Sequence, residues 1–299
     1  MILRTFRQGD EQLVLSLVNS AYRNLEQLSS ERLKSLTSPP YFNADGFFIA
    51  EDEETPLGCV GVFNLLAPGY FLMQYLAVKE AFSHLPIVDG LIQAAVNYAF
   101  LKQPKLLKAV TPTIQPYVEA YRRYGFQPVR RILRIAWDLK KAPEVKDASH
   151  TATVTEIHEN HIEEASNVFV YGLKPYWNWY IEEGGGDEPT RKRVTEWMRQ
   201  QIFLAARVHG KIAGVVGVMQ ATGSDEAATF GVIVLPQFRR KGIGSLLMKA
   251  ALSKAGELGC NRLHVHTMAY LDALAPGAVL YLKSGGRIEA EYVQLVKGL

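Results

Sequence analysis

A run of cations and glycines in the second half of the chain has the composition of a phosphate-binding loop. Arg239, Arg240 and Lys241 are followed by Gly242 and Gly244. Glycine lacks the Cβ atom that would keep phosphate oxygens away from backbone N–H groups, and the cations supply an attractive long-range field. These residue types at this spacing predict a polyphosphate ligand that is held mainly by main-chain groups.

The sequence on both sides of this loop predicts the elements that position it. Residues 232–235 are consecutive apolar residues and predict a buried strand, which Pro236 ends because proline cannot donate a ladder hydrogen bond. From Ser245 apolar residues recur with helical spacing as far as Leu258, and Gly259 follows where helix C-termini favour glycine. A loop that opens a helix presents unpaired N–H groups and a helix dipole, and both favour an anion.

Two widespread phosphate-binding motifs do not fit this loop. A P-loop requires Gly-Lys-Ser or Gly-Lys-Thr, whereas Gly244 is followed by Ser245 and Leu246. A dinucleotide fingerprint requires a third glycine, and Leu247 stands in its place. The alternative without a ligand is a solvated basic turn ahead of an ordinary helix.

The loop resembles that of the GNAT superfamily of acyl-CoA-dependent N-acetyltransferases. Residues 239–244 are similar to the Arg/Gln-x-x-Gly-x-Gly/Ala loop with which that family binds the pyrophosphate of coenzyme A. The preceding strand, whose backbone holds the pantetheine arm in that family, and the following helix agree with the resemblance. It implies acetyl-CoA as co-substrate, bound by Val232, Val234, Arg239, Arg240, Lys241, Gly242, Ile243, Gly244 and Ser245.

The composition limits the class of protein and its partners. The chain has 299 residues, of which 48% are hydrophobic and 21% charged, and its net charge of +3 is too mild to favour nucleic acid as the main partner. Cys59 and Cys260 are far apart and predict free thiols in a reducing compartment, and there is no spacing typical of a metal site. We expect a cytoplasmic monomer or homodimer without a signal peptide, metal or membrane span.

The predicted elements occur twice in the same order. Gly214-Val-Val-Gly-Val218 matches Gly58-Cys-Val-Gly-Val62, 156 positions earlier, and Tyr281-Leu-Lys-Ser-Gly285 matches Tyr121-Arg-Arg-Tyr-Gly125. Repetition at this length indicates a duplicated domain rather than a solenoid.

From this repeat we predict an α/β fold with two tandem GNAT-like domains, each a twisted, mostly antiparallel mixed sheet flanked by helices. The architecture is similar to that of mycothiol synthase-like proteins. We expect a degenerate domain over residues 1–140, a polar linker over residues 141–150 and a domain with the acyl-CoA loop over residues 151–299.

The first half lacks the loop that the second half carries. With Val78 aligned to Val234, Pro86 takes the place of Gly242 and has no N–H to offer a phosphate. The other two positions hold Ser83 for Arg239 and Val88 for Gly244. We therefore expect the first half to bind coenzyme A poorly or not at all.

Acyl transfer from a thioester to an amine requires a polarised carbonyl, a base for the amine and an acid for the departing thiolate. Residues 278–285 are similar to the family helix in which a tyrosine protonates the thiolate, which implies this role for Tyr281; a core tyrosine is the alternative. The family often has Asn where Ala275 stands and Phe where Gly286 stands. Gly231 predicts a bulge beside the thioester.

The base stays open at the level of sequence. His264 and His266 share one face of the strand that follows the helix, because side chains alternate along a strand. His266 is the candidate catalytic base, and a structural histidine is the alternative.

The acceptor site is predicted between residues 171 and 186, where the family places its variable acceptor-binding segment. Aromatic faces and carboxylates suit a cationic amine, and the run Gly184-Gly-Gly186 suggests a mobile loop or lid. The alternative is that the aromatic residues pack between the two halves. The candidate substrate-binding residues are Tyr176, Trp177, Trp179, Glu182 and Glu183.

The sequence thus predicts an enzyme that transfers acetyl from acetyl-CoA to a primary amine of a small molecule or peptide. Transfer is expected to be direct, in a ternary complex, because neither cysteine is placed as an acyl acceptor. The alternative class is a non-catalytic module that senses acyl-CoA or engages a partner.

Overall fold

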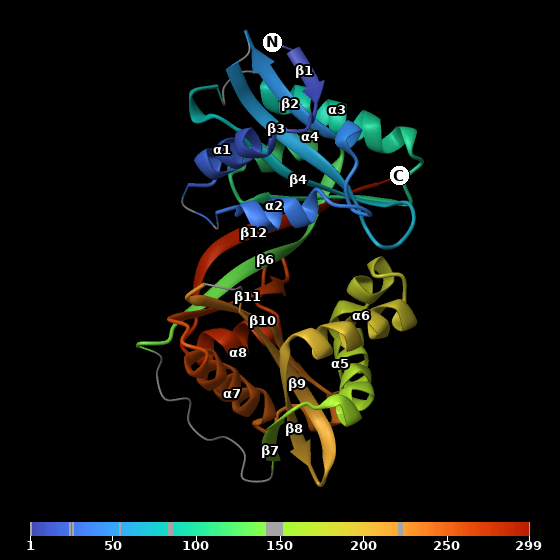
Figure 1. The fold of residues 1–299 in the computed structure, drawn as a ribbon. Coiled ribbons are helices and arrows are strands. Elements are labelled where there is room, and N and C mark those ends of the chain that lie inside the picture. The colour runs from blue at the N-terminus through green and yellow to red at the C-terminus, as the bar shows by residue number, and fades with distance from the viewer. Residues whose placement is uncertain are drawn as a thin grey trace. The chain divides into compact units, whose positions relative to one another are not determined.

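The computed structural model describes residues 2–23, 25, 27–53, 55–82, 86–141, 152–220 and 224–298. The chain divides into two compact units (Figure 1). Unit 1 comprises Met1–Arg131 and Ala290–Leu299, and unit 2 comprises Ile132–Glu289. Both are mixed α/β units with mostly antiparallel strand pairs, as predicted from the sequence.

Unit 1 has the strand order β1-β2-β3-β4-β5-β12, with β4 and β5 parallel and the other described pairs antiparallel. Helices pack on this sheet and bury a continuous apolar core with it. The elements are β1 (Ile2–Thr5), α1 (Glu11–Ala21), α2 (Ser30–Leu36), β2 (Phe47–Asp52), β3 (Thr55–Asn64), β4 (Tyr70–Val78), α3 (Ile87–Leu101), β5 (Leu106–Pro112), α4 (Gln115–Arg123), the start of β6 (Phe126–Asp138) and most of β12 (Arg287–Lys297).

Unit 2 has the strand order β6-β11-β10-β9-β8-β7, with β10 and β11 parallel. Its core has two parts, one between the sheet and α7 and α8, the other between the sheet and α5 and α6. The elements are β7 (Ala152–Glu156), α5 (Ile162–Glu183), α6 (Asp187–Gln200), β8 (Ile202–Val208), β9 (Lys211–Gln220), β10 (Glu226–Val234), α7 (Ile243–Glu257), β11 (Arg262–Ala269) and α8 (Pro276–Lys283).

The repeat seen in the sequence is also present in the packing. A Cβ atom on Gly61 of β3 would lie 2.7 Å from the Phe47 ring, and one on Gly217 of β9 would lie 2.7 Å from the Phe203 ring. At both positions a side chain is excluded because a phenylalanine of the neighbouring strand lies across the glycine. Each repeat therefore needs glycine here for the same reason.

The predicted domain boundaries differ from the units at two long strands. β6 begins in unit 1 and continues into unit 2, whereas β12 begins in unit 2 and continues into unit 1, where it pairs with β5. A division into residues 1–140 and 151–299 therefore assigns the end of each strand to the wrong unit. Most of the predicted linker, residues 142–150, lies outside the described residues.

Candidate active site

The candidate site in unit 2 lies where β10 and β11 stop pairing. Their parallel register runs from Glu226–Arg262 to Thr229–Val265, and within these described strands no pair follows it. The N–H of Leu235 donates to Ala213 on β9. Because main-chain groups alternate in direction along a strand, Val232 and Val234 turn their N–H and C=O groups away from β9, toward the opened edge.

A bulge bends β10 at the start of this open edge. The register with β9 shifts between Thr229 and Val232, and Gly231 has a φ of +87°, which L-residues rarely adopt. The prediction that Gly231 marks a bulge is confirmed.

Tyr281 of α8 reaches this bulge from the face that α7 and α8 cover. Its side chain is buried, and its hydroxyl accepts a hydrogen bond from the N–H of Val232 at 2.8 Å. Burial raises the pKa of Tyr281 to about 12, although the hydrogen bond from Val232 acts in the opposite direction. The phenol is therefore protonated at neutral pH, and its own hydrogen is directed away from the N–H that it accepts.

The space beside Tyr281 explains one departure from the family pattern. A Cβ atom on Gly286 would lie 2.6 Å from Ile135 and 2.9 Å from Trp137, both on β6. Trp137 is buried, packs edge-to-face on Tyr281 and donates from its indole N–H to the carbonyl of Ser284. The tryptophan thus occupies the space next to residue 286, and a phenylalanine there has no room.

The glycine loop forms the N-terminus of α7, as predicted. Gly242 is the N-cap residue with a left-handed φ of +78°, and the N–H of Leu246 makes the first helical hydrogen bond, to the carbonyl of Gly242. The N–H groups of Ile243, Gly244 and Ser245 precede that bond and lie at the positive end of the helix dipole. This arrangement can bind an anion through main-chain groups.

The three cations of the loop do not act alike in the structure. Arg240, with a left-handed φ of +62°, and Lys241 are exposed. Arg239 is partly buried and donates from Nε to the carbonyl of Val234 at 3.0 Å and from Nη2 to the carbonyl of Gly172 in α5 at 2.7 Å. The structure therefore keeps Arg240 and Lys241 at the loop surface and engages Arg239 with main-chain carbonyls.

His264 and His266 lie on β11, on the face that α5 and α6 cover. Val265 between them belongs to the core on the other face, so the two histidine side chains point the opposite way. His266 is exposed, and its ring lies edge-to-face with that of His264, with 5.6 Å between the centroids. The candidate base and the hydroxyl of Tyr281 are thus on opposite faces of the sheet.

A charged cluster that the sequence analysis did not recognise holds His264. Nδ1 of His264 is buried and lies 3.3 Å from Oε1 of Glu226. The two atoms are close enough for an ion pair but do not have the geometry of a hydrogen bond. Burial opposes ionisation of Glu226, but nearby His264 and Arg134, whose Nη2 is 2.6 Å away, outweigh it and lower the pKa of the Glu226 carboxyl to about 2. Because Arg134 is 92 positions from Glu226 in the sequence, local patterns carry no signal for the cluster.

The predicted acceptor segment is largely helical. Residues 171–183 form the second part of α5, which contains Pro175 and leaves helical geometry at Trp177. The rings of Trp177 and Trp179 lie edge-to-face with centroids 6.1 Å apart. Tyr176 is 40% exposed, and the Arg239 guanidinium lies 4.7 Å from the centroid of its ring. The carboxylate of Glu182 accepts a hydrogen bond from Asn178, and Glu183 is partly buried.

The glycines at the end of α5, where the sequence suggests a mobile loop or lid, form a hydrogen-bonded turn between two helices. The N–H groups of Gly184, Gly185 and Gly186 each donate to a carbonyl of the last helical turn. Arg193 of α6 donates to the carbonyl of Gly184. Glycine is needed here because φ is +92° at Gly185 and +100° at Gly186, so the run serves to reverse the chain between two helices.

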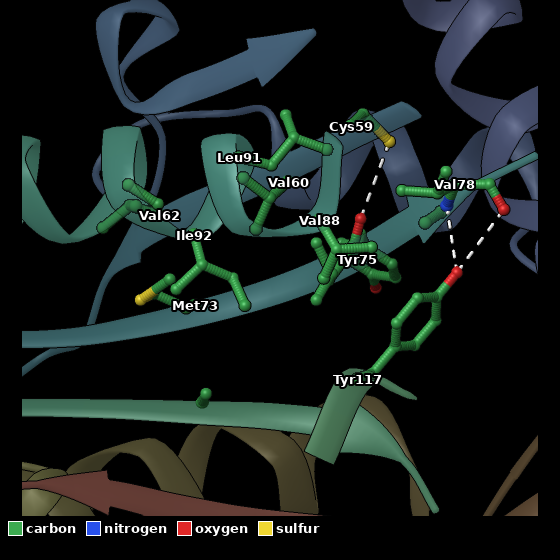
Figure 2. Close-up of a cluster of buried hydrophobic side chains, with 14 of the residues drawn as sticks. Cys59, Val60, Val62, Met73, Tyr75, Val78, Val88, Leu91, Ile92 and Tyr117 are labelled. Atoms are coloured by element: carbon green, nitrogen blue, oxygen red, sulfur yellow. Dashed lines mark hydrogen bonds between the residues drawn. The ribbon is translucent and has the colours of Figure 1, made fainter. Parts of the chain in front are cut away.

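In unit 1 tyrosine hydroxyls bond to the corresponding main-chain groups of β4, and Figure 2 shows that of Tyr117 at Val78. The hydroxyl of Tyr117 accepts from the N–H of Val78 at 3.0 Å and lies 3.4 Å from the carbonyl of the same residue. The hydroxyl of Tyr22 donates to the carbonyl of Leu76 at 2.8 Å. In the repeat, Val78 and Leu76 correspond to Val234 and Val232.

The loop of unit 1 also differs from that of unit 2. Pro86 is the N-cap residue of α3 and offers no N–H, and Val88 lies buried in the first helical turn. Ser83 lies outside the described residues.

A comparison with protein-family models decides the family of unit 2. Residues 173–275 match the model of the Acetyltransferase (GNAT) family, and the matched segment runs from α5 through the glycine loop and β11. Residues 173–275 thus have the sequence pattern of a GNAT-family acetyltransferase domain. The match ends before Tyr281. This residue is therefore placed at the site by the structure and not by the family model.

Solved structures extend the fold to the whole chain. A GCN5-related N-acetyltransferase from Sphaerobacter thermophilus superimposes with a TM-score of 0.78 at 15% identity, covering 99% of this chain and 95% of the other. A tandem GNAT protein from the clavulanic acid biosynthesis pathway gives a TM-score of 0.71 at 14% identity, covering 99% and 97%. The predicted tandem-GNAT fold is confirmed. A search of the curated proteins finds no match to this sequence.

In the part of the chain that the structure describes, no helix has both the length and the hydropathy needed to span a bilayer.

Proposed function

We propose that unit 2 transfers an acetyl group from acetyl-CoA to a primary amine of a small molecule or peptide, within a ternary complex. The observation that carries this proposal is the continuity of the site. The open edge of β10, with the Tyr281 hydroxyl on the N–H of Val232, leads after a short 3₁₀ turn into the left-handed Gly242 and the N-terminus of α7. An extended thioester arm fits beside β10 where β11 has diverged, next to the Tyr281 hydroxyl and the Arg239 guanidinium that bond to Val232 and Val234, and a pyrophosphate fits the helix N-terminus.

The chemistry follows from the placement of these groups. The amine nitrogen attacks the thioester carbonyl carbon, a C–N bond forms and the C–S bond breaks. The departing sulfur takes a proton from the hydroxyl of Tyr281, whose raised pKa keeps the phenol protonated until that moment. His266 is the candidate acceptor of the proton that the amine loses. Cys59 and Cys260 are buried, which supports direct transfer rather than an acyl-cysteine intermediate.

Calorimetric titration with acetyl-CoA tests the cofactor part of this proposal. We expect one site in the wild type and at least a tenfold weaker affinity in Gly242→Asp, because a carboxylate at the helix N-terminus repels the phosphates. Gly256→Asp is the matched control, since a Cβ at Gly256 in the same helix meets nothing within 4 Å. Loss of binding in both variants, or no binding by the wild type, would contradict the proposal.

Release of free thiol from acetyl-CoA, measured over a panel of primary amines, tests turnover. The panel includes glucosamine, because one structural neighbour is named as a glucosamine N-acetyltransferase region of a fungal β-N-acetylglucosaminidase; it superimposes with a TM-score of 0.73 at 12% identity. Thiol release that requires an amine supports the enzyme. Binding of acetyl-CoA without release over the whole panel supports the non-catalytic acyl-CoA-binding module instead.

A further inference from the structure

α5 is interrupted beside the glycine loop of unit 2. Pro175 lies inside the helix and has no N–H, and Trp177 has φ of −131° and ψ of 39°, outside the helical region. Pro175 leaves the carbonyl of Tyr171, four residues earlier, without its helical N–H donor, and the break at Trp177 interrupts the helical hydrogen bonds that span it. The two parts of α5 on either side of Trp177 are therefore not joined by a continuous hydrogen-bond ladder.

Arg239 supplies a donor from the loop. Its Nη2 is 2.7 Å from the carbonyl oxygen of Gly172, and its Nε is 3.0 Å from the carbonyl oxygen of Val234 at the end of β10. The same guanidinium lies over the ring of Tyr176, 4.7 Å from its centroid. One planar side chain thus contacts the end of β10, the turn of α5 before the break and Tyr176, which is one of the candidate substrate-binding residues.

Next to this contact, α5 packs so closely on β10 that the helix cannot move nearer to the strand. A Cβ atom on Gly172 would lie 2.4 Å from Cγ2 of Ile233 in β10, so the helix backbone rests directly on the strand. Arg239 adds contacts just before the break, to the carbonyl of Gly172 and to the ring of Tyr176. Beyond the break, the buried Ile181 and the turn at residues 184–186 hold α5. The guanidinium therefore acts on the position of Tyr176 rather than on the whole of residues 173–183.

We propose that Arg239 is a positioning residue for the acceptor side of the site, holding Tyr176 and the turn of α5 at Gly172 against the end of β10, and that it is not a phosphate ligand. This inference rests on the proposed function of unit 2. It assigns the phosphates to main-chain groups of α7 and to the exposed cations Arg240 and Lys241. Recognition of the amine then depends on an arginine of the acyl-CoA loop.

Two substitutions of Arg239 separate its charge from its shape. Arg239→Lys keeps the positive charge that would attract a phosphate but loses the planar fork that reaches two carbonyls. Arg239→Ala loses both. In both variants we expect the KM for the best acceptor of the amine panel to rise about 10-fold or more, the size of a lost charge-assisted hydrogen bond. The Kd for acetyl-CoA, measured by calorimetry, is expected to change less than about threefold.

Arg240→Ala is the matched control from the same loop and is expected to give the opposite pattern, with a weaker acetyl-CoA affinity and an unchanged KM for the acceptor. Hydrogen exchange of the α5 amides around Tyr176 provides a readout that does not depend on turnover, and it is expected to accelerate in both Arg239 variants. Circular dichroism identifies a variant that fails to fold.

The proposal is overturned if Arg239→Ala weakens acetyl-CoA binding more than tenfold while Arg239→Lys does not, since charge alone would then account for the effect. It is also overturned if exchange around Tyr176 is unchanged. A wild type that binds acetyl-CoA but acetylates no amine would refute the proposed function, and the exchange and calorimetric results would still decide the role of Arg239.

Discussion

At the scale of single residues, Tyr281 combines burial, a hydrogen bond to the strand edge and a protonated hydroxyl. In Tyr281→Phe we expect kcat to fall about 10²- to 10⁴-fold, the range for loss of a general acid. Among the described hydrogen bonds, no other hydroxyl contacts the N–H of Val232 and could take over this role. Acetyl-CoA affinity by calorimetry should change little. A variant with wild-type kcat would show that Tyr281 is a packing residue.

Glu226 links a single carboxylate to the acid stability of unit 2. Its pKa is lowered from 4.5 to about 2, so the folded state binds its proton less readily than the unfolded state. Its contribution to stability is therefore complete above about pH 4.5 and is lost as the pH falls toward about 2. In Glu226→Gln we expect lower stability at neutral pH and a difference from the wild type that shrinks on acidification.

Urea unfolding at neutral pH and at about pH 3 measures this difference. Asp138→Asn is a suitable control, since this carboxylate is about half exposed and its contact with Lys141 is local. A difference for Glu226→Gln that stays constant between the two pH values would contradict the assignment.

At the scale of elements, the contact between α5 and β10 depends on the absence of a side chain at residue 172. In Gly172→Ala the new methyl group would lie 2.4 Å from Cγ2 of Ile233, a branch of a buried side chain that cannot move away freely. We expect the free energy of unfolding to fall by about 1–3 kcal/mol, as for overpacked cores, despite the better helix propensity of alanine. Thermal unfolding measures this loss.

Gly256→Ala in helix α7 is expected to raise the free energy of unfolding instead, because a Cβ atom there meets nothing within 4 Å. Alanine should stabilise that helix by up to about 1 kcal/mol. If Gly172→Ala raised the free energy of unfolding as Gly256→Ala does, Gly172 would tolerate a methyl group and the close approach would not be required.

The glycine loop could be predicted from the sequence because its determinants are local. The strand ends before Pro236, Gly242 adopts the left-handed conformation that glycine allows, and α7 follows at once. Each step depends on residues within a few positions of one another. The same holds for the bulge at Gly231, which a lone glycine in an apolar strand indicates.

The partners of Arg239 and Glu226 could not be predicted in this way. Arg239 bonds to Gly172, 67 positions away, and the position of that carbonyl depends on how closely α5 packs on Ile233 of β10. The sequence indicates that Arg239 is a cation but not where its guanidinium is directed. A residue type thus predicts a kind of chemistry, whereas the partner is set by packing between distant elements.

At the scale of the whole chain, the boundary between the two units could not be predicted because the last strand of each repeat continues into the other unit. The core of unit 2 contains Leu133, Ile135 and Trp137 of β6, which precede the predicted linker. Conversely, Val293 and Leu295 of β12 belong to the core of unit 1. A linker identified by composition marks where the chain is polar, not where the cores divide.

The two units differ at the equivalent strand positions Val78 and Val234 and in the loop that follows each strand, and this sets the expected stoichiometry. In unit 1 the hydroxyl of Tyr117 satisfies the N–H of Val78, and Pro86 removes one N–H from the N-terminus of α3. We therefore expect one acetyl-CoA per chain in a calorimetric titration. Tyr117→Phe should not add a second site, because the phenyl ring still fills the edge and Pro86 is unchanged.

Tyr117→Phe should instead destabilise unit 1, by about 1–3 kcal/mol, because the N–H of Val78 is left buried without its partner. Thermal unfolding measures this loss, and titration of the same variant with acetyl-CoA counts its sites. Two sites in the wild type would contradict the prediction directly. Two sites that emerge only in Tyr117→Phe would mean that the Tyr117 hydroxyl alone prevents unit 1 from binding acetyl-CoA. The tyrosine, rather than the missing glycine loop, would then account for the functional difference between the two repeats.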